Sequence, residues 1–273
     1  MPIALTIAGF DPSAGAGVLA DVKTLAAHGV YGMACVTALT VQSTQGVRRV
    51  EPVAPAVIRE TLDCLAQDVR FTAIKIGMLG SLAVLEAVLD WLQSQPGVPV
   101  VLDPILRSSS GAPLLDSAGL ARLRNGGLAR ADWITPNLAE AAALVDGPIA
   151  TNPAEMERCT RALQAQAARA GNPRLGVVLT GGHAERPDDY VAWPGGCAWL
   201  PGERVDTTAT HGTGCTFSSA LTAQLALGTE PVEAARRAKY YVTSALQGAE
   251  PIGQGAGPLN HFWAALPFRE PNR

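Results

Sequence analysis

Apolar residues along this chain form short continuous runs that alternate with longer segments of helical character. The short runs, typical of strands buried on both faces, cover residues 3–8, 73–76, 98–102, 133–135 and 175–179. The helical segments extend up to about residue 28, and then over residues 54–67, 81–94, 116–128, 138–145, 153–170 and 231–247, with a further helix after Thr213. Such alternation predicts an α/β fold with a doubly wound, mostly parallel sheet flanked by helices.

Two pairs of β-rich segments stand apart from this alternation. Residues 31–41 and 46–53 predict a small ribbon off the main sheet, and residues 190–193 and 196–200 predict a hairpin. No repeat, long linker or low-complexity tract divides the 273 residues. Because a chain of this length can form one large α/β domain, we predict a single domain over the whole sequence.

The composition agrees with a covered sheet and narrows the functional class. The chain is 48% hydrophobic and 16% charged, with a mean hydropathy of +0.16. A net charge of −3 gives no reason to expect nucleic acid or an anionic membrane as a partner. Five scattered cysteines without CxxC spacing argue against a disulfide framework or a zinc site. Neither a signal peptide nor an apolar run of about 20 residues is evident, so we expect a cytoplasmic protein.

Glycine and polar residues follow five of the predicted strands. They are residues 11–17, 77–78, 103–104, 135–137 and 181–183. In a doubly wound sheet, ligands bind beyond the carboxyl ends of the strands. The convergence of these residues at one edge of the sheet therefore predicts a binding site there.

The sequence T-H-G-T-G-C-T-F-S-S at residues 210–219 opens an apolar helix. Backbone N–H groups at such a loop-to-helix junction point the same way, and the helix dipole adds partial positive charge. This arrangement predicts an anion site suited to a phosphoryl group in transfer. The same field predicts a lowered pKa for Cys215. The alternative is a glycine-rich helix start with a buried cysteine.

Residues 15–20 match the dinucleotide fingerprint GxGxxA. That fingerprint needs an acidic residue about 20 positions later, but no Asp or Glu lies between Val22 and Val50. The pattern therefore argues against NAD. The glycines instead predict a backbone turn that passes close to a small ligand, with Asp11 or Asp21 available to hydrogen-bond it.

Three polar residues are candidates for a site that holds Mg²⁺ and phosphate. Asp103 follows a strand and can bind Mg²⁺ directly or through water, or else cap a turn. Asn137 and Glu140 lie three residues apart at a helix start, so both side chains can face one point. Their alternative role is a helix N-cap with a first-turn acid.

Two further features leave the chemistry open. His183 and His211 lie in glycine-rich turns, and a histidine near Cys215 is compatible with a cysteine hydrolase, although no third orienting group is evident. Gln42 lies in a polar patch after the β-rich stretch. Its amide offers both a donor and an acceptor to the edge of a heterocycle, or it is an ordinary surface residue.

Taken together and in this order, eight motifs make the chain resemble a known family. They are G-x-D-P-S-x-G-A-G-x-x-A-D (residues 9–21), G-x-Y-G-M (29–33), T-A-L-T-x-Q (37–42), K-I-G-M-L (75–79), L-D-P (102–104), T-P-N-L-x-E-A (135–141), G-G-H (181–183) and T-H-G-T-G-C-T (210–216). The chain resembles the hydroxymethylpyrimidine/phosphomethylpyrimidine kinases of thiamine biosynthesis, in the ribokinase-like superfamily, over nearly its whole length.

The resemblance implies ATP-dependent, Mg²⁺-assisted phosphorylation of 4-amino-5-hydroxymethyl-2-methylpyrimidine, usually also of its monophosphate, by a homodimer. It implies that Cys215 stands where ribokinase relatives carry an aspartate base. The other roles that it implies are an anion hole at Gly212, Thr213 and Gly214, a pyrimidine site at Gly9, Asp21, Gln42 and Met78, nucleotide and phosphate contacts at Asn137, Thr180, Gly182 and Arg107, and Mg²⁺ contacts at Asp103 and Glu140.

The chain departs from the family pattern at two positions. Thr180 stands where family members usually carry a lysine before Gly-Gly-His, and Ser109 replaces another lysine. Arg107 can substitute for one of the two cations, but guanidinium and ammonium are not equivalent. Because the monophosphate brings extra negative charge, we expect the second phosphorylation to be the step most at risk.

Two other functions remain open from the sequence. One is a pyridoxal-type kinase on the same fold, since pyridoxal is also a hydroxymethyl heterocycle. The other is a pyrimidine-binding sensor without catalysis, in which the lost lysines are traces of lost chemistry. The intact residues 212–215 argue against the sensor.

Overall fold

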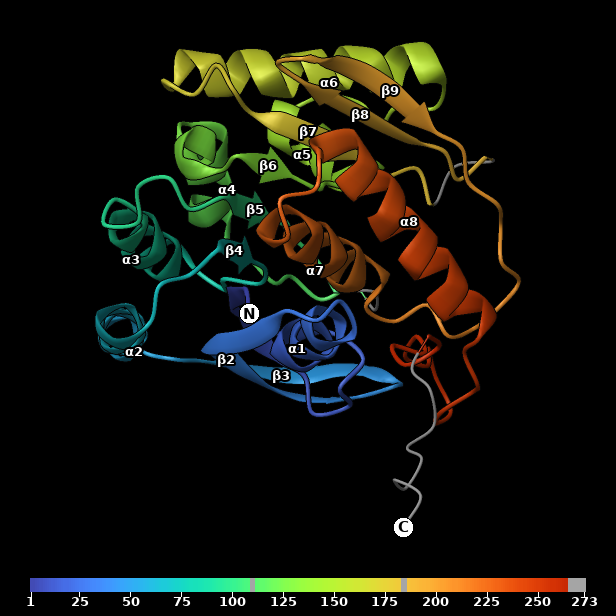
Figure 1. Cartoon of the computed structure of the whole chain (residues 1–273), viewed down its shortest axis with the longest axis horizontal. Helices are drawn as coiled ribbons and strands as arrows, with labels where there is room; N and C mark the ends of the chain where they lie inside the picture. Colours follow the sequence, from blue (N-terminus) through green and yellow to red (C-terminus); the bar gives the residue numbers. More distant parts are fainter. Residues whose placement is uncertain (109–110, 183–185, 265–273) are drawn as a thin grey trace.

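A computed structural model describes residues 1–108, 111–182 and 186–264. Its described strands form one nine-stranded sheet in the order β3-β2-β1-β4-β5-β6-β7-β8-β9 (Figure 1). The strands are β1 Ile3–Phe10, β2 Tyr31–Ser43, β3 Gly46–Pro52, β4 Ala73–Ile76, β5 Val100–Leu102, β6 Trp133–Ile134, β7 Gly176–Leu179, β8 Asp189–Trp193 and β9 Gly196–Leu200. The predicted sheet and the predicted hairpin, which is β8 and β9, are confirmed.

The six strands from β2 to β7 in this order pair in parallel, and β3, β8 and β9 add antiparallel edges. The chain places β2 on one side of β1 and β4 on the other. The point between β1 and β4 is therefore the topological switch point, where the carboxyl ends of parallel strands leave room for a ligand.

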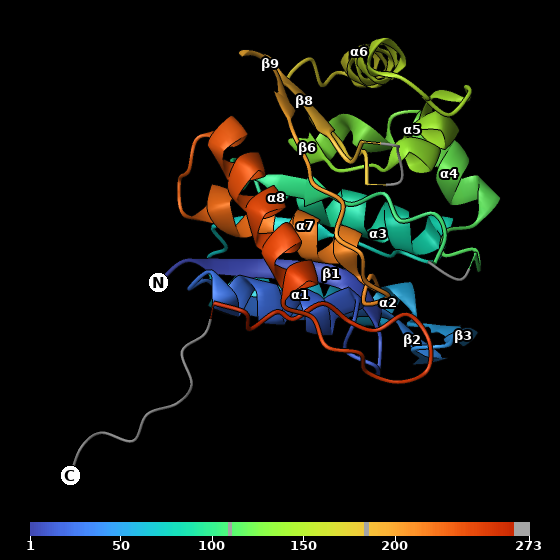
Figure 2. The ribbon, with the colours of Figure 1, turned by 90° about the vertical axis from the view of Figure 1, so that its right-hand side faces the viewer.

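Helices cover both faces of the sheet (Figures 1 and 2). Their bounds are α1 Gly17–Ala27, α2 Pro55–Asp68, α3 Leu82–Leu92, α4 Ser117–Arg124, α5 Leu138–Val145, α6 Pro153–Arg169, α7 Thr213–Ala226 and α8 Pro231–Gln247, with a 3₁₀ helix η1 at Gly127–Arg130. Helices α1, α7 and α8 pack on one face, and α2 to α6 cover the other. Among the described residues, none of the helices is long and apolar enough to cross a membrane.

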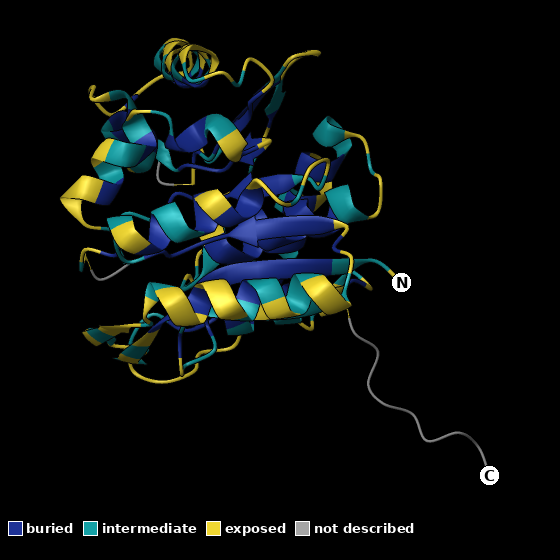
Figure 3. Ribbon diagram, turned by 90° about the vertical axis from the view of Figure 1, so that its left-hand side faces the viewer, coloured by how far each residue is buried: buried dark blue, intermediate teal, exposed yellow. Residues whose placement is uncertain are grey.

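The central strands are dark blue in Figure 3 and are among the most deeply buried elements, together with α7. Every residue of β4, β5 and β7 is buried, and ten consecutive residues at the start of α7, from Cys215 to Gln224, are buried as well. Because α7 lies against β1, β4 and β5, its first turn is held at the switch point by packing on the sheet.

Two predictions about local structure need correction. The expected ribbon is not separate from the main sheet: β2 pairs with β1 from Tyr31 to Leu39, and only its last residues extend with β3 beyond the end of β1. The helix expected over residues 116–128 ends at Arg124, because Gly126 adopts a φ of 99° that an α-helix cannot continue through.

Candidate active site

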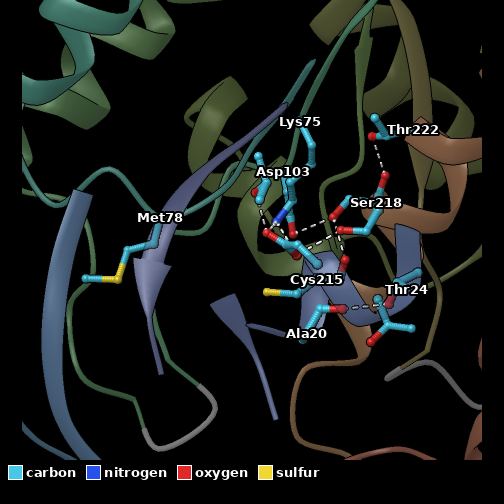
Figure 4. A network of polar contacts seen from close by, with 12 residues as sticks. Ala20, Thr24, Lys75, Met78, Asp103, Cys215, Ser218 and Thr222 are labelled. Atoms are coloured by element: carbon cyan, nitrogen blue, oxygen red, sulfur yellow. Dashed lines mark hydrogen bonds and ion pairs between the residues drawn. The ribbon is translucent and has the colours of Figure 1, made fainter. Parts of the chain in front are cut away.

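A buried polar network lies under the switch point, and Figure 4 shows how its members meet. Lys75 of β4 is fully buried, and its ammonium donates to both carboxylate oxygens of Asp21 at 2.9 Å. Asp21 of α1 also accepts from the hydroxyls of Thr6 at 2.5 Å and Ser219 at 2.8 Å. The network therefore connects β1, β4, α1 and α7.

The position of Asp21 differs from the expected one. The resemblance implies that it lines the pyrimidine pocket, but its side chain is fully buried and makes hydrogen bonds to three protein side chains. In this arrangement Asp21 acts on the site through Lys75 and α7. Burial favours the neutral form of Lys75, but the interactions with Asp21, Cys215 and Asp103 together outweigh that effect and raise the pKa of Lys75, so the Asp21–Lys75 pair is ionic.

A second buried carboxylate, Asp103, follows β5 and faces the start of α7. Ser218 donates to its Oδ2 at 3.0 Å. Burial raises the pKa of Asp103 to about 6, although Lys75 and Ser218 oppose the shift. Burial and the Asp103 charge together raise the pKa of Glu140 to about 8. The two carboxylates thus repel each other, Asp103 from a buried position and Glu140 from a half-buried one.

Such a pair fits a bound Mg²⁺, which uses one or two protein carboxylates and completes its shell with water and phosphate oxygens. Among the described residues, no group of three or more His, Cys, Asp or Glu side chains can form a complete protein cage. The Asp103–Glu140 pair fits a cation that is shared with a phosphate ligand.

Asn137 and Glu140 form a capping box at the start of α5. The Asn137 side chain accepts from the Glu140 N–H at 2.9 Å, and the Glu140 carboxylate accepts from the Asn137 N–H at 2.9 Å. The helix-capping role considered from the sequence is therefore present. It also fixes the Glu140 carboxylate, whose interaction with Asp103 places both acids at the same edge of the sheet.

Cys215 lies in the first turn of α7 and is 7% exposed. The expected lowering of its pKa is wrong: burial raises the pKa of Cys215 to about 12, and the charge of Lys75 opposes this only in part. The physical reason is that loss of solvent outweighs the helix field. In Figure 4 the sulfur points away from the polar network, toward the side on which Met78 lies.

The glycines before Cys215 let two loops touch. Gly212 precedes α7 with a φ of 84°, and no described side chain caps the helix. A methyl group at Gly212 would lie 1.8 Å from the carbonyl oxygen of Gly15, so the loop after β1 is in direct contact with the loop before α7. First-turn N–H groups have no partner within a helix. At the α7 start the Thr213 N–H donates to the Thr210 carbonyl at 3.4 Å, and the N–H groups of Gly214 and Cys215 have no backbone partner among the described residues, which leaves them available for an anion.

Polar side chains on these loops connect to β2. His211 Nε2 lies 2.7 Å from Asp11 Oδ2 and 3.1 Å from Gln42 Nε2. Asp11 is 3% exposed and also accepts from the backbone and hydroxyl of Ser13 and from the Ala16 N–H. The structure thus brings Gln42 next to the loop before α7, although residue 42 and residue 211 are far apart in sequence.

Gly9 and Met78 are neighbours at the ends of β1 and β4. A methyl group at Gly9 would lie 2.8 Å from the Met78 sulfur. Met78 is buried, and its carbonyl accepts from the Thr37 hydroxyl of β2 at 2.6 Å. These two candidates therefore share one wall beside β2, the strand that carries Gln42.

The remaining candidates lie near α5 or on the surface. Thr180 follows β7 and pairs with Pro136 through its N–H at 3.0 Å, next to Asn137. Gly182 is exposed. Arg107 is exposed, and its guanidinium donates to the Gly111 carbonyl at 3.2 Å. Ser109 and His183 lie outside the described residues.

The role of Lys75 was not predicted from the sequence, where this residue was named only as part of the K-I-G-M-L motif. The available signal was its position: a lysine inside the four-residue buried strand AIKI must have a buried partner. The partnership of Asp11 with His211 was also missed, because no local pattern connects the loop after β1 with the loop before α7.

Comparison with known proteins gives a consistent result. The family model described as phosphomethylpyrimidine kinase matches residues 11–260. The hydroxymethylpyrimidine/phosphomethylpyrimidine kinase of Escherichia coli K12 is 42% identical over 265 residues, covering 96% of this chain and 97% of that protein. Bacillus subtilis pyridoxal kinase in its ADP complex superposes with a TM-score of 0.86 at 31% identity, covering 97% of this chain and 98% of that one. Phosphomethylpyrimidine kinase from Clostridium difficile 630 superposes with a TM-score of 0.78 at 32% identity, covering 90% of this chain and 100% of that one.

Proposed function

Because the chain belongs to the phosphomethylpyrimidine kinase family, we propose that it phosphorylates the hydroxymethyl group of 4-amino-5-hydroxymethyl-2-methylpyrimidine with ATP, for the synthesis of thiamine diphosphate. The observation that carries the proposal is the position of Cys215. It lies in the first turn of α7, at the switch point of the sheet, near the buried Asp103 carboxylate, which together with the half-buried Glu140 carboxylate suits a cation with phosphates.

The pyrimidine is proposed to lie between β2 and the start of α7. Gln42 supplies an amide for the edge of the ring, and the Gly9–Met78 wall provides an apolar contact for its face. Gly9 lacks a side chain where a methyl group would already collide with Met78. The hydroxymethyl group then points toward Cys215.

Phosphoryl transfer forms a bond from the hydroxymethyl oxygen to the γ-phosphorus of ATP and breaks the bond to ADP. The N–H groups of Gly212, Thr213, Gly214 and Cys215 are proposed to hold the transferred phosphoryl group, with the dipole of α7 behind them. The hydroxyl proton goes to the Cys215 thiolate. Because the pKa of this thiol is raised, the thiolate is the minor form at neutral pH, and Lys75 is the charge that favours it.

ATP is proposed to lie over the ends of β5 to β7, where the ADP complex of the structurally similar Bacillus subtilis kinase makes a nucleotide site reasonable. Asp103 and Glu140 would hold Mg²⁺, which neutralises phosphate charge when bound. Asn137, Thr180, Gly182 and Arg107 are the proposed nucleotide and phosphate contacts.

The experiment that tests the function is product analysis after incubation with ATP, Mg²⁺ and the hydroxymethylpyrimidine. A pyrophosphate product would mean that both transfers occur despite Thr180 and Ser109. A monophosphate alone would make the protein a first-step kinase. Tight pyrimidine binding without any product would overturn the kinase proposal in favour of a sensor.

A pyridoxal kinase is the second candidate, because one of the similar structures bears that name at a TM-score of 0.86. The curated relative at 42% identity is named for the pyrimidine instead. A ratio of kcat/KM on pyridoxal to kcat/KM on the pyrimidine well above one would favour the second candidate.

We also propose a cytoplasmic homodimer built from one domain per chain. Leu39 and Val41 on β2 are about half exposed, at 52% and 48%, and such apolar residues on an extended ribbon suit a contact between copies. Light scattering that gives the monomer mass at micromolar concentration would contradict the dimer. Two separate unfolding transitions would contradict the single domain.

A further inference from the structure

The Thr40 hydroxyl and the His211 ring contact the two ends of the Gln42 amide, and each of them has a second hydrogen-bond partner. The Thr40 hydroxyl lies 3.0 Å from the Phe10 carbonyl oxygen and 3.2 Å from Gln42 Oε1. On the other side, His211 Nε2 lies 3.1 Å from Gln42 Nε2 and 2.7 Å from Asp11 Oδ2. The two ends of the amide therefore face a hydroxyl and an imidazole nitrogen.

Counting hydrogens fixes the end that faces His211. The Asp11 carboxylate accepts from three other donors, two on Oδ1 and one on Oδ2, so it carries no proton to give. His211 Nε2 must then carry the hydrogen that joins it to Asp11. A protonated ring nitrogen has no lone pair in the ring plane, so it cannot accept from an amide N–H. The Gln42 atom beside His211 is therefore the carbonyl oxygen.

The hydrogen bonds of Thr40 indicate the same orientation of the Gln42 amide. A threonine hydroxyl has one hydrogen, and the Phe10 carbonyl can only accept. Once Thr40 donates to Phe10, its oxygen must accept from Gln42. The Gln42 atom beside Thr40 is therefore the amide nitrogen. Exchanging the two ends of the amide removes the mismatch on both sides, and the His211 N–H is then shared between Asp11 at 2.7 Å and the Gln42 carbonyl oxygen at 3.1 Å.

We infer that Thr40, His211 and Asp11 are positioning residues that hold the Gln42 amide in one orientation and thereby select the heterocycle. This inference rests on the proposed function, in which Gln42 faces the pyrimidine. One N–H and one carbonyl lone pair of the amide remain for the ligand. A 4-aminopyrimidine edge offers a donor beside an acceptor, and a 4-oxopyrimidine edge offers the reverse. The ring cannot turn over, because its hydroxymethyl group must point to Cys215, so a fixed amide accepts only one of the two.

The test is the ratio of kcat/KM on 5-hydroxymethyl-2-methylpyrimidine with a 4-amino group to that on its 4-oxo counterpart. Thr40→Val removes the hydroxyl at nearly constant shape, and Thr40→Ser keeps it. His211→Leu removes the donor, and His211→Gln keeps an N–H near the Nε2 position. We expect the Val and Leu variants to lower the ratio about tenfold, mainly through KM for the amino substrate, and the Ser and Gln variants to stay within about threefold of wild type.

Two results would overturn the inference. One is a wild-type kinase whose amino-to-oxo ratio is unchanged in Thr40→Val and His211→Leu, even if both variants are slower. The other is a neutron structure with deuterium on the Gln42 atom that faces His211, a readout that does not depend on activity. Failure of the proposed function would look different, because the wild type itself would then phosphorylate neither ring.

Discussion

The two polar clusters of this molecule differ in what they leave for a ligand. The Asp21 carboxylate is fully buried and takes hydrogen bonds from β1, β4 and α7, whereas the Gln42 amide is half-buried and keeps one donor and one acceptor free for the substrate. Burying a charge pair makes the loss of one partner costly. Substitutions in the inner cluster should therefore change stability most, and those at the rim should change selectivity most.

The largest expected effect is on the stability of a Lys75→Met variant. The substitution leaves the Asp21 carboxylate buried without its cation, so the free energy of unfolding should fall by about 3–5 kcal/mol. Urea denaturation followed by circular dichroism measures it. The matched double variant Lys75→Met/Asp21→Asn removes both charges and should regain most of the loss. Equal losses in the single and double variants would mean that the ion pair is not the cause.

The next effect is on catalysis by Cys215→Ala. Because Cys215 is the proposed base at the anion hole, kcat should fall about 100-fold or more, with a much smaller change in unfolding free energy than Lys75→Met. Steady-state kinetics on the pyrimidine measures this. Cys197→Ala, at an exposed cysteine away from the site, is the control. A kcat within about threefold of wild type would remove Cys215 from the proton transfer.

A third prediction concerns pH. Since burial raises the pKa of the Cys215 thiol from 9.0 to about 12, its thiolate fraction should increase about tenfold per pH unit between pH 7 and 9 without a plateau. The rate of Cys215 alkylation by iodoacetamide, measured by peptide mass spectrometry, should increase by the same factor as the thiolate fraction. Alkylation of the Cys197 peptide in the same samples shows that the reagent is active at each pH. A plateau below pH 8 would show that the thiol is activated after all.

The same shift has a consequence for stability. A raised pKa in the folded state favours the protonated thiol, so the contribution is fully present below pH 9 and is lost as the pH rises from 9 toward 12. Cys215→Ala should therefore unfold with a weaker dependence on pH in this window than wild type. Parallel pH profiles for the two proteins would contradict the shift.

The smallest effect is expected at the exposed Arg107. Its substitution by Gln removes the one charge proposed to replace a family lysine, so the monophosphate should be turned over a few-fold more slowly, with little change for the uncharged alcohol. Product analysis with both substrates measures the difference. An equal decrease on the two substrates would show that Arg107 does not respond to the extra phosphate.

The sequence predicts the framework well because its signals are local. Strand and helix periods place the parallel sheet, and the glycine-rich T-H-G-T-G-C stretch marks the start of α7 where the structure has it. The break at Gly126 was missed because one glycine in an otherwise helical segment is weak evidence. The continuity of β2 with the sheet depends on its pairing with β1, which no local pattern encodes.

In the candidate site, too, local features can be predicted from the sequence and contacts between distant segments cannot. Residues such as Cys215 and Asp103 can be found because they end strands or begin helices, but the electrostatics around them cannot. The pKa of Cys215 depends on how completely α7 is covered, and the partner of Lys75 lies on another element. Both depend on tertiary packing. An argument from the helix field alone therefore predicts the wrong direction for the pKa shift of the Cys215 thiol.

The contact between Gly15 and Gly212 also limits how this protein can vary. Neither position has room for a methyl group: one at Gly15 would lie 2.3 Å from the His211 ring, and one at Gly212 would lie 1.8 Å from the Gly15 carbonyl oxygen. Each position is therefore restricted to glycine by a residue in the other half of the chain. A library randomised at both codons and selected for growth without thiamine should return glycine at both, and single substitutions at one should not be rescued by changes at the other.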